Sequence, residues 1–288
     1  MGKRQEVQVT VGAVQMKFHH DIAANVDSIC RQIRSAAERR VDMLLFPECA
    51  LTGYNRDFHT VLQAEVIAGL AAVAQSARAS HCNVLVGAPT WSGERCFNTL
   101  LVFNRKGKEV FRYSKIHLTR RDQRFFQPGN TLAFFRLDGI GCTAMICHER
   151  RYPELVRLPV MLGAQLIFHP NAGLDSLPVS KAKRKGRDGI ATRAFENAVY
   201  YIFANSVGPQ GDGLWSAGDS KIVSPGSQVL ALANNRDEAL IQSTLDLSLA
   251  TRSYALEALK QPAFLQKPWA ALLQACRDQW HQSGASRS

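Results

Sequence analysis

Three polar residues, Glu48, Lys115 and Cys147, each stand at or just after the end of a predicted strand. Open α/β sheets bind their ligands at strand ends, so these side chains are the first candidates for chemistry. Cys147 directly follows the apolar stretch 140–146, and Pro153 is well placed to be the first residue of a helix. A cysteine between an apolar strand and a helix start can act as a nucleophile.

The surroundings of Cys147 favour a thiol with a lowered pKa. The positive end of the helix dipole stabilises a thiolate, and Arg150, Arg151 and Lys115 add positive charge. The alternative is a buried structural cysteine, because most free cysteines are small core residues. The first interpretation predicts a nucleophile that is active near neutral pH.

The number and spacing of the cysteines favour neither a disulfide framework nor a zinc site. The seven form an odd set that contains no Cys-x-x-Cys pair. Cys142, Cys147 and His148 match no common zinc spacing, and strand alternation separates their side chains. A phosphatase-type loop needs an arginine where Pro153 stands. We expect reduced thiols and no metal or organic cofactor.

The elements that must position these residues alternate between strand and helix. The segment 7–15 alternates apolar and polar residues at period 2, and Asp21 is a suitable N-cap for the helix after it. Beyond residue 97, a polar connection with a glycine at 104–108 favours a hairpin. The predicted strands are 7–15, 43–46, 83–87, 97–103, 109–113, 132–137, 140–146, 165–168, 199–204, 221–224, 228–232 and 240–245, and the predicted helices are 22–37, 61–79, 153–162, 180–197 and 269–282. This order predicts a layered α/β core.

Length and composition indicate one large globular domain. The 288 residues are 46% hydrophobic and 20% charged, which excludes disordered and fibrous chains. We predict a domain over 1–250 and a C-terminal arm over 251–288, where Pro262 and Pro268 interrupt the pattern. No apolar run approaches the roughly 18 residues of a membrane span, and the start of the chain lacks the apolar core of a signal peptide. A cytoplasmic location without membrane contact is expected.

The net charge of +11 bears on partners rather than on fold. It is compatible with an anionic substrate or with nucleic acid. The densest basic cluster, 180–187, holds five basic residues, but no nucleic-acid-binding module or aromatic interleaving accompanies it. Such runs are usually solvated faces, so we expect no nucleic-acid partner.

The segments around the three candidate residues resemble signature segments of the nitrilase superfamily of carbon–nitrogen hydrolases. They are Phe46-Pro47-Glu48-Cys49-Ala50-Leu51-Thr52-Gly53-Tyr54, Lys115-Ile116-His117-Leu118 and Cys147-His148-Glu149-Arg150-Arg151-Tyr152-Pro153-Glu154. The later segments 193–197 and 218–225 agree with them. The resemblance runs from about Val7 to Leu247 and implies an α/β fold of the four-layer α-β-β-α sandwich type.

The resemblance also implies a Glu-Lys-Cys site at Glu48, Lys115 and Cys147. The cysteine attacks an amide or nitrile carbon, the glutamate takes the thiol proton and gives it to departing ammonia, and the lysine stabilises the negative oxygen. The backbone amide of His148 is expected to be a second donor to that oxygen. Water then cleaves the thioester.

One position departs from the family pattern. Family members commonly carry a second catalytic glutamate before a Phe-x-Pro-Gly segment, and here 126–129 is preceded by Asp122. Because aspartate is one methylene shorter, either the loop moves to compensate or the support is altered. The alternative is a solvated aspartate among neighbouring arginines. After Cys147, His148-Glu149 stands where family members more often have an aromatic residue or asparagine followed by aspartate. Glu149 is expected to orient the loop.

The segment after Cys147 most resembles that of family members acting on N-carbamoyl amino acids. In those proteins adjacent arginines hold a substrate carboxylate, which guanidinium groups bind through two parallel hydrogen bonds. An arginine at the Arg151 position also occurs in relatives with other substrates, so Arg150 is the more discriminating. The predicted substrate-binding residues are Arg150, Arg151, His148, Tyr54 and Asn171.

The predicted function is hydrolysis of a small amide or N-carbamoyl compound, with an acid-bearing substrate expected first and ammonia as a product. Nitrile hydrolysis is an alternative, and so is a scaffold or binding protein of the same fold whose catalysis is weakened by Asp122 and His148-Glu149. Relatives usually form dimers or larger oligomers with crossing C-terminal arms. The arm at 251–288 is therefore expected to contact a second copy in a homodimer or higher homo-oligomer.

Overall fold

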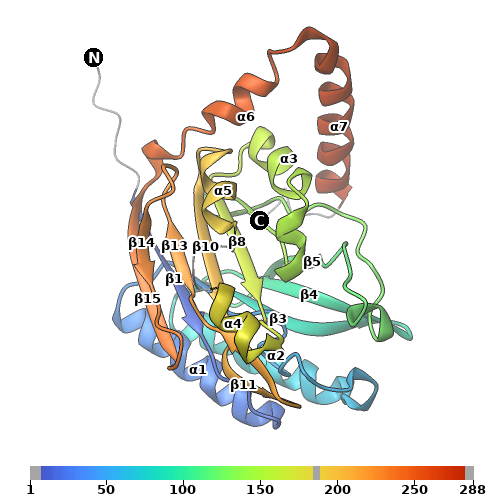
Figure 1. The fold of residues 1–288 in the computed structure, drawn as a ribbon, viewed down its shortest axis with the longest axis vertical. Coiled ribbons are helices and arrows are strands. Elements are labelled where there is room, and N and C mark those ends of the chain that lie inside the picture. Colours follow the sequence, from blue (N-terminus) through green and yellow to red (C-terminus); the bar gives the residue numbers. More distant parts are fainter. Residues whose placement is uncertain (1–7, 184–188, 283–288) are drawn as a thin grey trace.

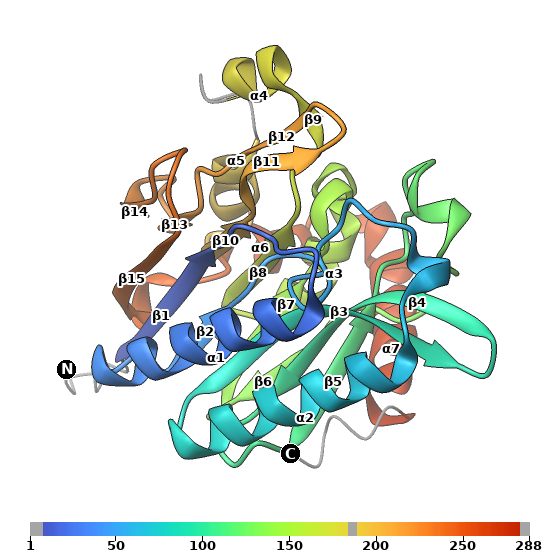
Figure 2. The ribbon, with the colours of Figure 1, turned by 90° about the horizontal axis from the view of Figure 1, so that it is seen from below.

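The structure, a computed structural model, describes residues 8–183 and 189–282. Two six-stranded sheets face one another, and helices cover the outer face of each (Figure 1). The view from below shows α1 and α2 side by side on the outer face of the first sheet (Figure 2). This four-layer arrangement confirms the predicted α-β-β-α fold class.

The strand order shows how the chain builds the two sheets. The first sheet has the order β15-β1-β2-β3-β4-β5, with β15 Ala239–Asp246, β1 Gln8–Gln15, β2 Met43–Leu45, β3 Asn83–Ser92, β4 Arg95–Phe103 and β5 Glu109–Ser114. The second has the order β14-β13-β10-β8-β7-β6, with β14 Val229–Leu232, β13 Lys221–Val223, β10 Tyr200–Asn205, β8 Leu166–Asn171, β7 Ile140–Ala144 and β6 Phe135–Leu137. The helices are α1 Ile22–Glu38, α2 Gln63–Ala79, α3 Glu154–Leu162, α4 Leu177–Lys183, α5 Ile190–Phe195, α6 Ser253–Ala258 and α7 Ala263–Gln282.

The main core lies between the two sheets. Alternate residues of β1, Val9, Val11 and Ala13, belong to one buried cluster with Phe135 and Phe168 of the second sheet. A second cluster lies under α1 and α2, and a third lies between the second sheet and α3, α5 and α7. Because apolar layers cover both faces of each sheet, inner strands such as β2 and β8 are buried along their whole length.

The helix predicted over 180–197 is wrong as one element. The structure has α4, which ends at Lys183, and α5, which begins at Ile190 after Gly189. Gly189 has a φ of +66°, a left-handed conformation that an unbroken helix cannot contain. Residues 184–188, which hold part of the predicted basic cluster, lie outside the described residues, as do 1–7 and 283–288.

Two further features differ from the expected elements. The segments on either side of β10 contain a small sheet, of β9 Asp175–Ser176, β11 Val207–Gly211 and β12 Leu214–Ala217, for which no strands were predicted. The last helix begins at Ala263, six residues earlier than predicted, and contains Pro268 in its second turn, where proline has no N–H to donate to the preceding turn. Within the described residues, no helix is long and apolar enough to cross a membrane.

Candidate active site

Glu48 lies in the tight loop that follows β2. The backbone amide of Phe46 donates to the carbonyl of Leu85 at 2.8 Å, which keeps the chain against β3 as it leaves the sheet. A Cβ on Gly87 would lie 2.5 Å from the backbone nitrogen of Cys49 and 2.9 Å from the Cα of Glu48. Only glycine permits this approach, and Glu48 is consequently only 1% exposed.

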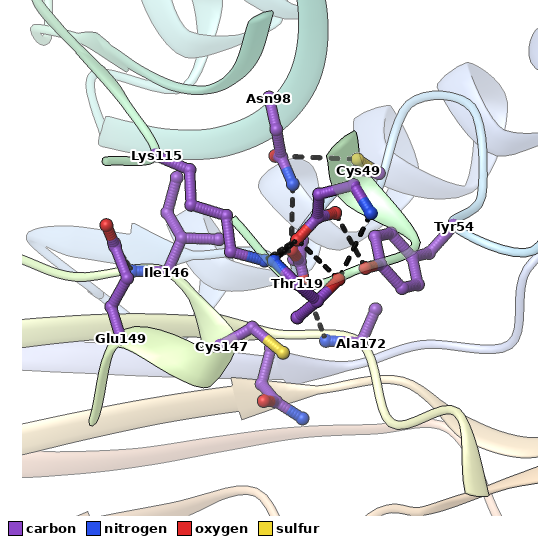
Figure 3. A network of polar contacts seen from close by, with 12 residues as sticks. Cys49, Tyr54, Asn98, Lys115, Thr119, Ile146, Cys147, Glu149 and Ala172 are labelled. Carbon is purple, nitrogen blue, oxygen red and sulfur yellow. Dashed lines mark hydrogen bonds and ion pairs between the residues drawn. The ribbon is translucent and has the colours of Figure 1, made fainter. Parts of the chain in front are cut away.

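Lys115 follows β5 and joins two carboxylates inside the protein. Its side chain is 0% exposed, and its Nζ lies 2.8 Å from Oε1 of Glu48 and 2.8 Å from Oδ2 of Asp122. Its backbone amide donates to the carbonyl of Asn98 on β4, which anchors the end of β5. Figure 3 shows the Lys115 side chain reaching from this strand end toward the region above Cys147. The sequence-predicted meeting of Glu48 and Lys115 is therefore observed.

Asp122 is part of this buried cluster. It is 0% exposed, so the alternative of a solvated loop aspartate is wrong. Its carboxylate accepts hydrogen bonds from the Tyr54 hydroxyl at 2.7 Å, the Thr119 backbone amide at 2.9 Å and the Thr119 hydroxyl at 2.8 Å. Burial by itself would raise the pKa of Asp122, but Lys115 and these donors outweigh it and hold the pKa below its usual value. The short turn from Thr119 to Asp122 brings the shorter side chain within reach of the lysine.

The hydrogen bonds of Glu48 indicate an ionised carboxylate. Oε1 accepts from Lys115 Nζ and from Asn98 Nδ2, both at 2.8 Å, and Oε2 accepts from the backbone amide of Ala172 at 3.1 Å. All three partners are donors, as a carboxylate requires. Burial nevertheless raises the pKa of Glu48, although Lys115 opposes the shift. A buried carboxylate with a raised pKa is suited to accept a proton.

Cys147 begins a 3₁₀ turn, Cys147–Arg151, rather than α3. Its φ is +53°, and α3 begins only at Glu154. The predicted lowering of the thiol pKa is wrong: burial, followed by the nearby negative charge of Glu48, raises the pKa of Cys147 to about 12. The thiol is protonated near neutral pH, so a base must remove its proton before it can act as a nucleophile.

Glu149 holds the turn that carries Cys147. Its Oε1 accepts from the backbone amides of Ile116 at 2.7 Å and His117 at 3.1 Å, and its Oε2 accepts from the amide of Ile146 at 2.7 Å. The Tyr113 hydroxyl lies 2.9 Å from Oε1 and 3.0 Å from Oε2. One buried carboxylate thus ties the segment after Lys115 to the segment before Cys147. This contact agrees with the expectation that Glu149 orients the loop.

His169 supports the same turn from below, in its neutral form. Its Nε2 lies 3.0 Å from the carbonyl of Cys147, and its Nδ1 lies 2.7 Å from the Tyr201 hydroxyl. Burial, with the positive charge of Arg150, lowers the pKa of His169 to about 3. A neutral ring satisfies both contacts when Nε2–H donates to the carbonyl and Nδ1 accepts from the tyrosine.

A cavity of about 360 Å³ opens beside Cys147, and Tyr54, His148, Arg150, Arg151 and Asn171 all line it. Arg150 is half-buried, whereas Arg151 is exposed. Tyr54 already donates its hydroxyl to the buried cluster, which makes it a fixed part of the wall. The structure therefore places all five residues predicted to bind substrate around one cavity.

Several residues at this site carried no signal in the sequence. Asn98 and Thr119 are common residue types outside the quoted motifs, and their contacts with the two carboxylates depend on how β4 and the loop after β5 fold. Tyr113 and Gly87 lie within predicted strands and looked like ordinary sheet residues. Across the part of the chain that the structure describes, no three His, Cys, Asp or Glu side chains form a group that could hold a metal ion.

Comparison with solved structures identifies the fold. An amidase of the nitrilase superfamily from Nesterenkonia matches with a TM-score of 0.78 at 24% identity, over 91% of this chain and 97% of that one. The four-layer sandwich is therefore the fold of nitrilase-superfamily amidases.

Comparison with sequence families is more specific. The carbon–nitrogen hydrolase family matches residues 10–254. A hydrolase from Pseudomonas protegens is 32% identical over 82% of each chain, and an (R)-stereoselective amidase from a Pseudomonas species is 30% identical over 81% of this chain and 84% of that one. An omega-amidase of Homo sapiens is 27% identical over 88% of this chain and 93% of that one. The chain belongs to the carbon–nitrogen hydrolase family, and the relatives it resembles include amidases.

Proposed function

We propose that this protein hydrolyses a small amide or N-carbamoyl compound through a thioester on Cys147, and that it releases ammonia. The observation that carries the proposal is the buried cluster of Glu48, Lys115 and Asp122, whose charges all act on the Cys147 thiol. A protonated thiol, a carboxylate of raised pKa and a buried ammonium are the three groups that acyl transfer from an amide needs.

In the first half of the reaction, Cys147 Sγ attacks the carbonyl carbon while Glu48 takes the thiol proton. Lys115 gives two of its three N–H bonds to Glu48 and Asp122, which leaves the third for the negative oxygen. The backbone amide of His148 is the proposed second donor. The tetrahedral intermediate then collapses, the carbon–nitrogen bond breaks, and Glu48 returns the proton to the leaving ammonia.

In the second half, water attacks the thioester carbon and gives a proton to Glu48. The carbon–sulfur bond breaks, and the proton passes from Glu48 to the thiolate, which restores the starting state. Asp122 keeps Lys115 charged and fixed through both halves, because burial of an ammonium without such partners would favour its neutral form. Asp122 therefore fills the role of the second family glutamate in this proposal.

The charges around the cavity favour a substrate with an acid group. Arg120, Arg121, Arg150 and Arg151 line it, whereas Asp175 is the one acidic residue among the lining residues. A guanidinium group binds a carboxylate through two parallel, charge-assisted hydrogen bonds. Since Arg150 is half-buried and belongs to the turn that Cys147 begins, it is the proposed carboxylate ligand.

The proposal is tested by ammonia release from ω-amides, aliphatic amides, N-carbamoyl amino acids and nitriles. We expect release from one amide or N-carbamoyl class by the wild type and none by Cys147→Ala. Arg150→Gln should raise KM at least tenfold for acid substrates, whereas the control Arg112→Gln, at an exposed site away from the cavity, should not. Undiminished turnover by Cys147→Ala would refute the mechanism, and a folded, inactive wild type would favour the scaffold alternative.

We further propose that residues 251–288 contact a second copy of the chain, next to a hydrolase domain over 1–250, and that the enzyme acts in the cytoplasm as a homodimer or larger homo-oligomer. Phe264 and Leu272 on α7 are 77% and 47% exposed, and they are the apolar residues of this helix that a contact with a second copy would cover. Light scattering should show a dimer or larger species that Phe264→Glu weakens. A monomeric wild type at micromolar concentration would contradict this.

A further inference from the structure

We propose that Asn98 and Cys49 are positioning residues that make Oε2 of Glu48, rather than Oε1, the atom that takes the proton of Cys147. The inference rests on the proposed role of Glu48 as the general base. Neither Asn98 nor Cys49 was a candidate from the sequence, and both lie beside the buried carboxylate, at 1% and 0% exposure.

The two oxygens of Glu48 have different surroundings. Oε1 accepts two strong hydrogen bonds, from Lys115 Nζ and Asn98 Nδ2, both at 2.8 Å. Oε2 accepts one longer bond, from the backbone amide of Ala172 at 3.1 Å. An oxygen that already accepts two short bonds, one of them from an ammonium, is the weaker base. Oε2 is therefore the more basic oxygen, and the one that accepts fewer hydrogen bonds, so it can take the proton of Cys147.

This difference depends on which way the Asn98 amide faces. With Nδ2 toward Glu48 it donates to the carboxylate, whereas the flipped amide would place Oδ1 against Oε1, two acceptors in contact. Such a flipped amide would favour a protonated, inactive Glu48. Because the two orientations of an asparagine amide have almost the same shape, a neighbouring group must select the orientation of Asn98.

The thiol of Cys49 selects the orientation of the Asn98 amide. Its Sγ lies 3.6 Å from Oδ1 of Asn98, within reach of a thiol hydrogen bond, and Figure 3 shows this contact on the side of the amide away from Lys115. A thiol that donates to Oδ1 leaves only Nδ2 for Glu48. Burial also raises the pKa of Cys49 well above its usual value, so the thiol keeps the proton that it donates.

Neither positioning residue lines the cavity beside Cys147. Substitutions at Asn98 and Cys49 should therefore act on proton transfer, not on substrate binding. Loss of the Asn98 donor removes an interaction that lowers the pKa of Glu48. The expected signature is a shift of the acid limb of kcat/KM toward higher pH with little change of KM.

The test compares pH profiles of ammonia release for variants of matched size. Asn98→Leu should move the acid limb upward by about one pH unit, with less than a twofold change of KM. Cys49→Ala should move it in the same direction by less, and Cys49→Ser, which keeps a donor, should restore its position. Cys82→Ala, which shortens a buried cysteine in another part of the core, should leave the limb in place.

A second readout needs no substrate and separates this inference from the proposed function. The rate of alkylation of Cys147 by iodoacetamide, followed by mass spectrometry of its peptide, should rise with ionisation of Glu48 and show the same shifts. If the wild type cleaves no amide, the proposed function fails while the alkylation profiles still decide about Asn98. An unmoved acid limb in Asn98→Leu, or equal profiles for Cys49→Ser and Cys49→Ala, would overturn the inference.

Discussion

Replacement of Glu149 by glutamine tests how firmly the nucleophile's turn is held. The carboxylate accepts three backbone amides at 2.7–3.1 Å, from Ile116, His117 and Ile146. A glutamine has only one acceptor oxygen, so its NH₂ group must face a backbone N–H that Glu149 now satisfies. Loss of a hydrogen bond to a charged group, with a buried donor left unpaired, costs about 3 kcal/mol.

The expected result for Glu149→Gln is a free energy of unfolding lowered by about 3 kcal/mol in urea denaturation. Turnover should also fall about 100-fold, because a shift of the Cys147 turn by about 1 Å is sufficient for such a loss. The control Tyr113→Phe removes one donor and leaves all three backbone bonds in place, and about 1.5 kcal/mol is expected. Wild-type stability and turnover in Glu149→Gln would refute the reasoning.

Three further predictions follow from burial at the site. Gly87→Ala should lower the free energy of unfolding by about 1–3 kcal/mol and remove most of the activity, because the new Cβ displaces Glu48. In the control Gly226→Ala, the nearest atom to the new Cβ is 3.9 Å away, so stability and activity should not change. Asp122→Glu should lower turnover at least tenfold despite the family pattern, because the shorter side chain already meets its donors in a fully buried site. His169 has a pKa of about 3 when folded against 6.5 ordinarily, so stability is lost as pH falls below 6.5. Between pH 7 and pH 5, the free energy of unfolding measured in urea should fall by about 2 kcal/mol more for the wild type than for His169→Gln. An equal fall in the two proteins would contradict this.

The sequence predicted the positions of Glu48, Lys115 and Cys147 well for a physical reason. Each stands at or just after the end of a predicted strand, and open α/β sheets place their ligand sites at strand ends, even though β2 and β5 are not neighbours in the first sheet and β7 belongs to the second. The order of strands and helices followed from hydrophobic periodicity for the same reason, because the period reports which face is buried. The grouping of these three side chains into one site was what the resemblance to the nitrilase superfamily implied, because their strands are not adjacent.

The electrostatics of Cys147 could not be predicted in the same way. The helix dipole and the arginines are visible in the sequence, whereas burial of the thiol beside a carboxylate depends on how the two sheets pack. In the structure α3 begins only at Glu154, so its dipole does not act at Cys147, and burial with the charge of Glu48 raises the pKa of the thiol instead of lowering it. The small sheet of β9, β11 and β12 was missed because its strands are two to five residues long, too short for a periodic pattern.

In the proposed mechanism Cys147 carries the acyl group during turnover. The most direct measurement is the mass of the Cys147 peptide after acid quenching during hydrolysis of a substrate found by ammonia release. We expect a mass increment equal to the acyl part of the substrate on that peptide, and neither the increment nor ammonia with Cys147→Ala. Ammonia release by Cys147→Ala at the wild-type rate, or an acyl group on a different residue, would contradict it.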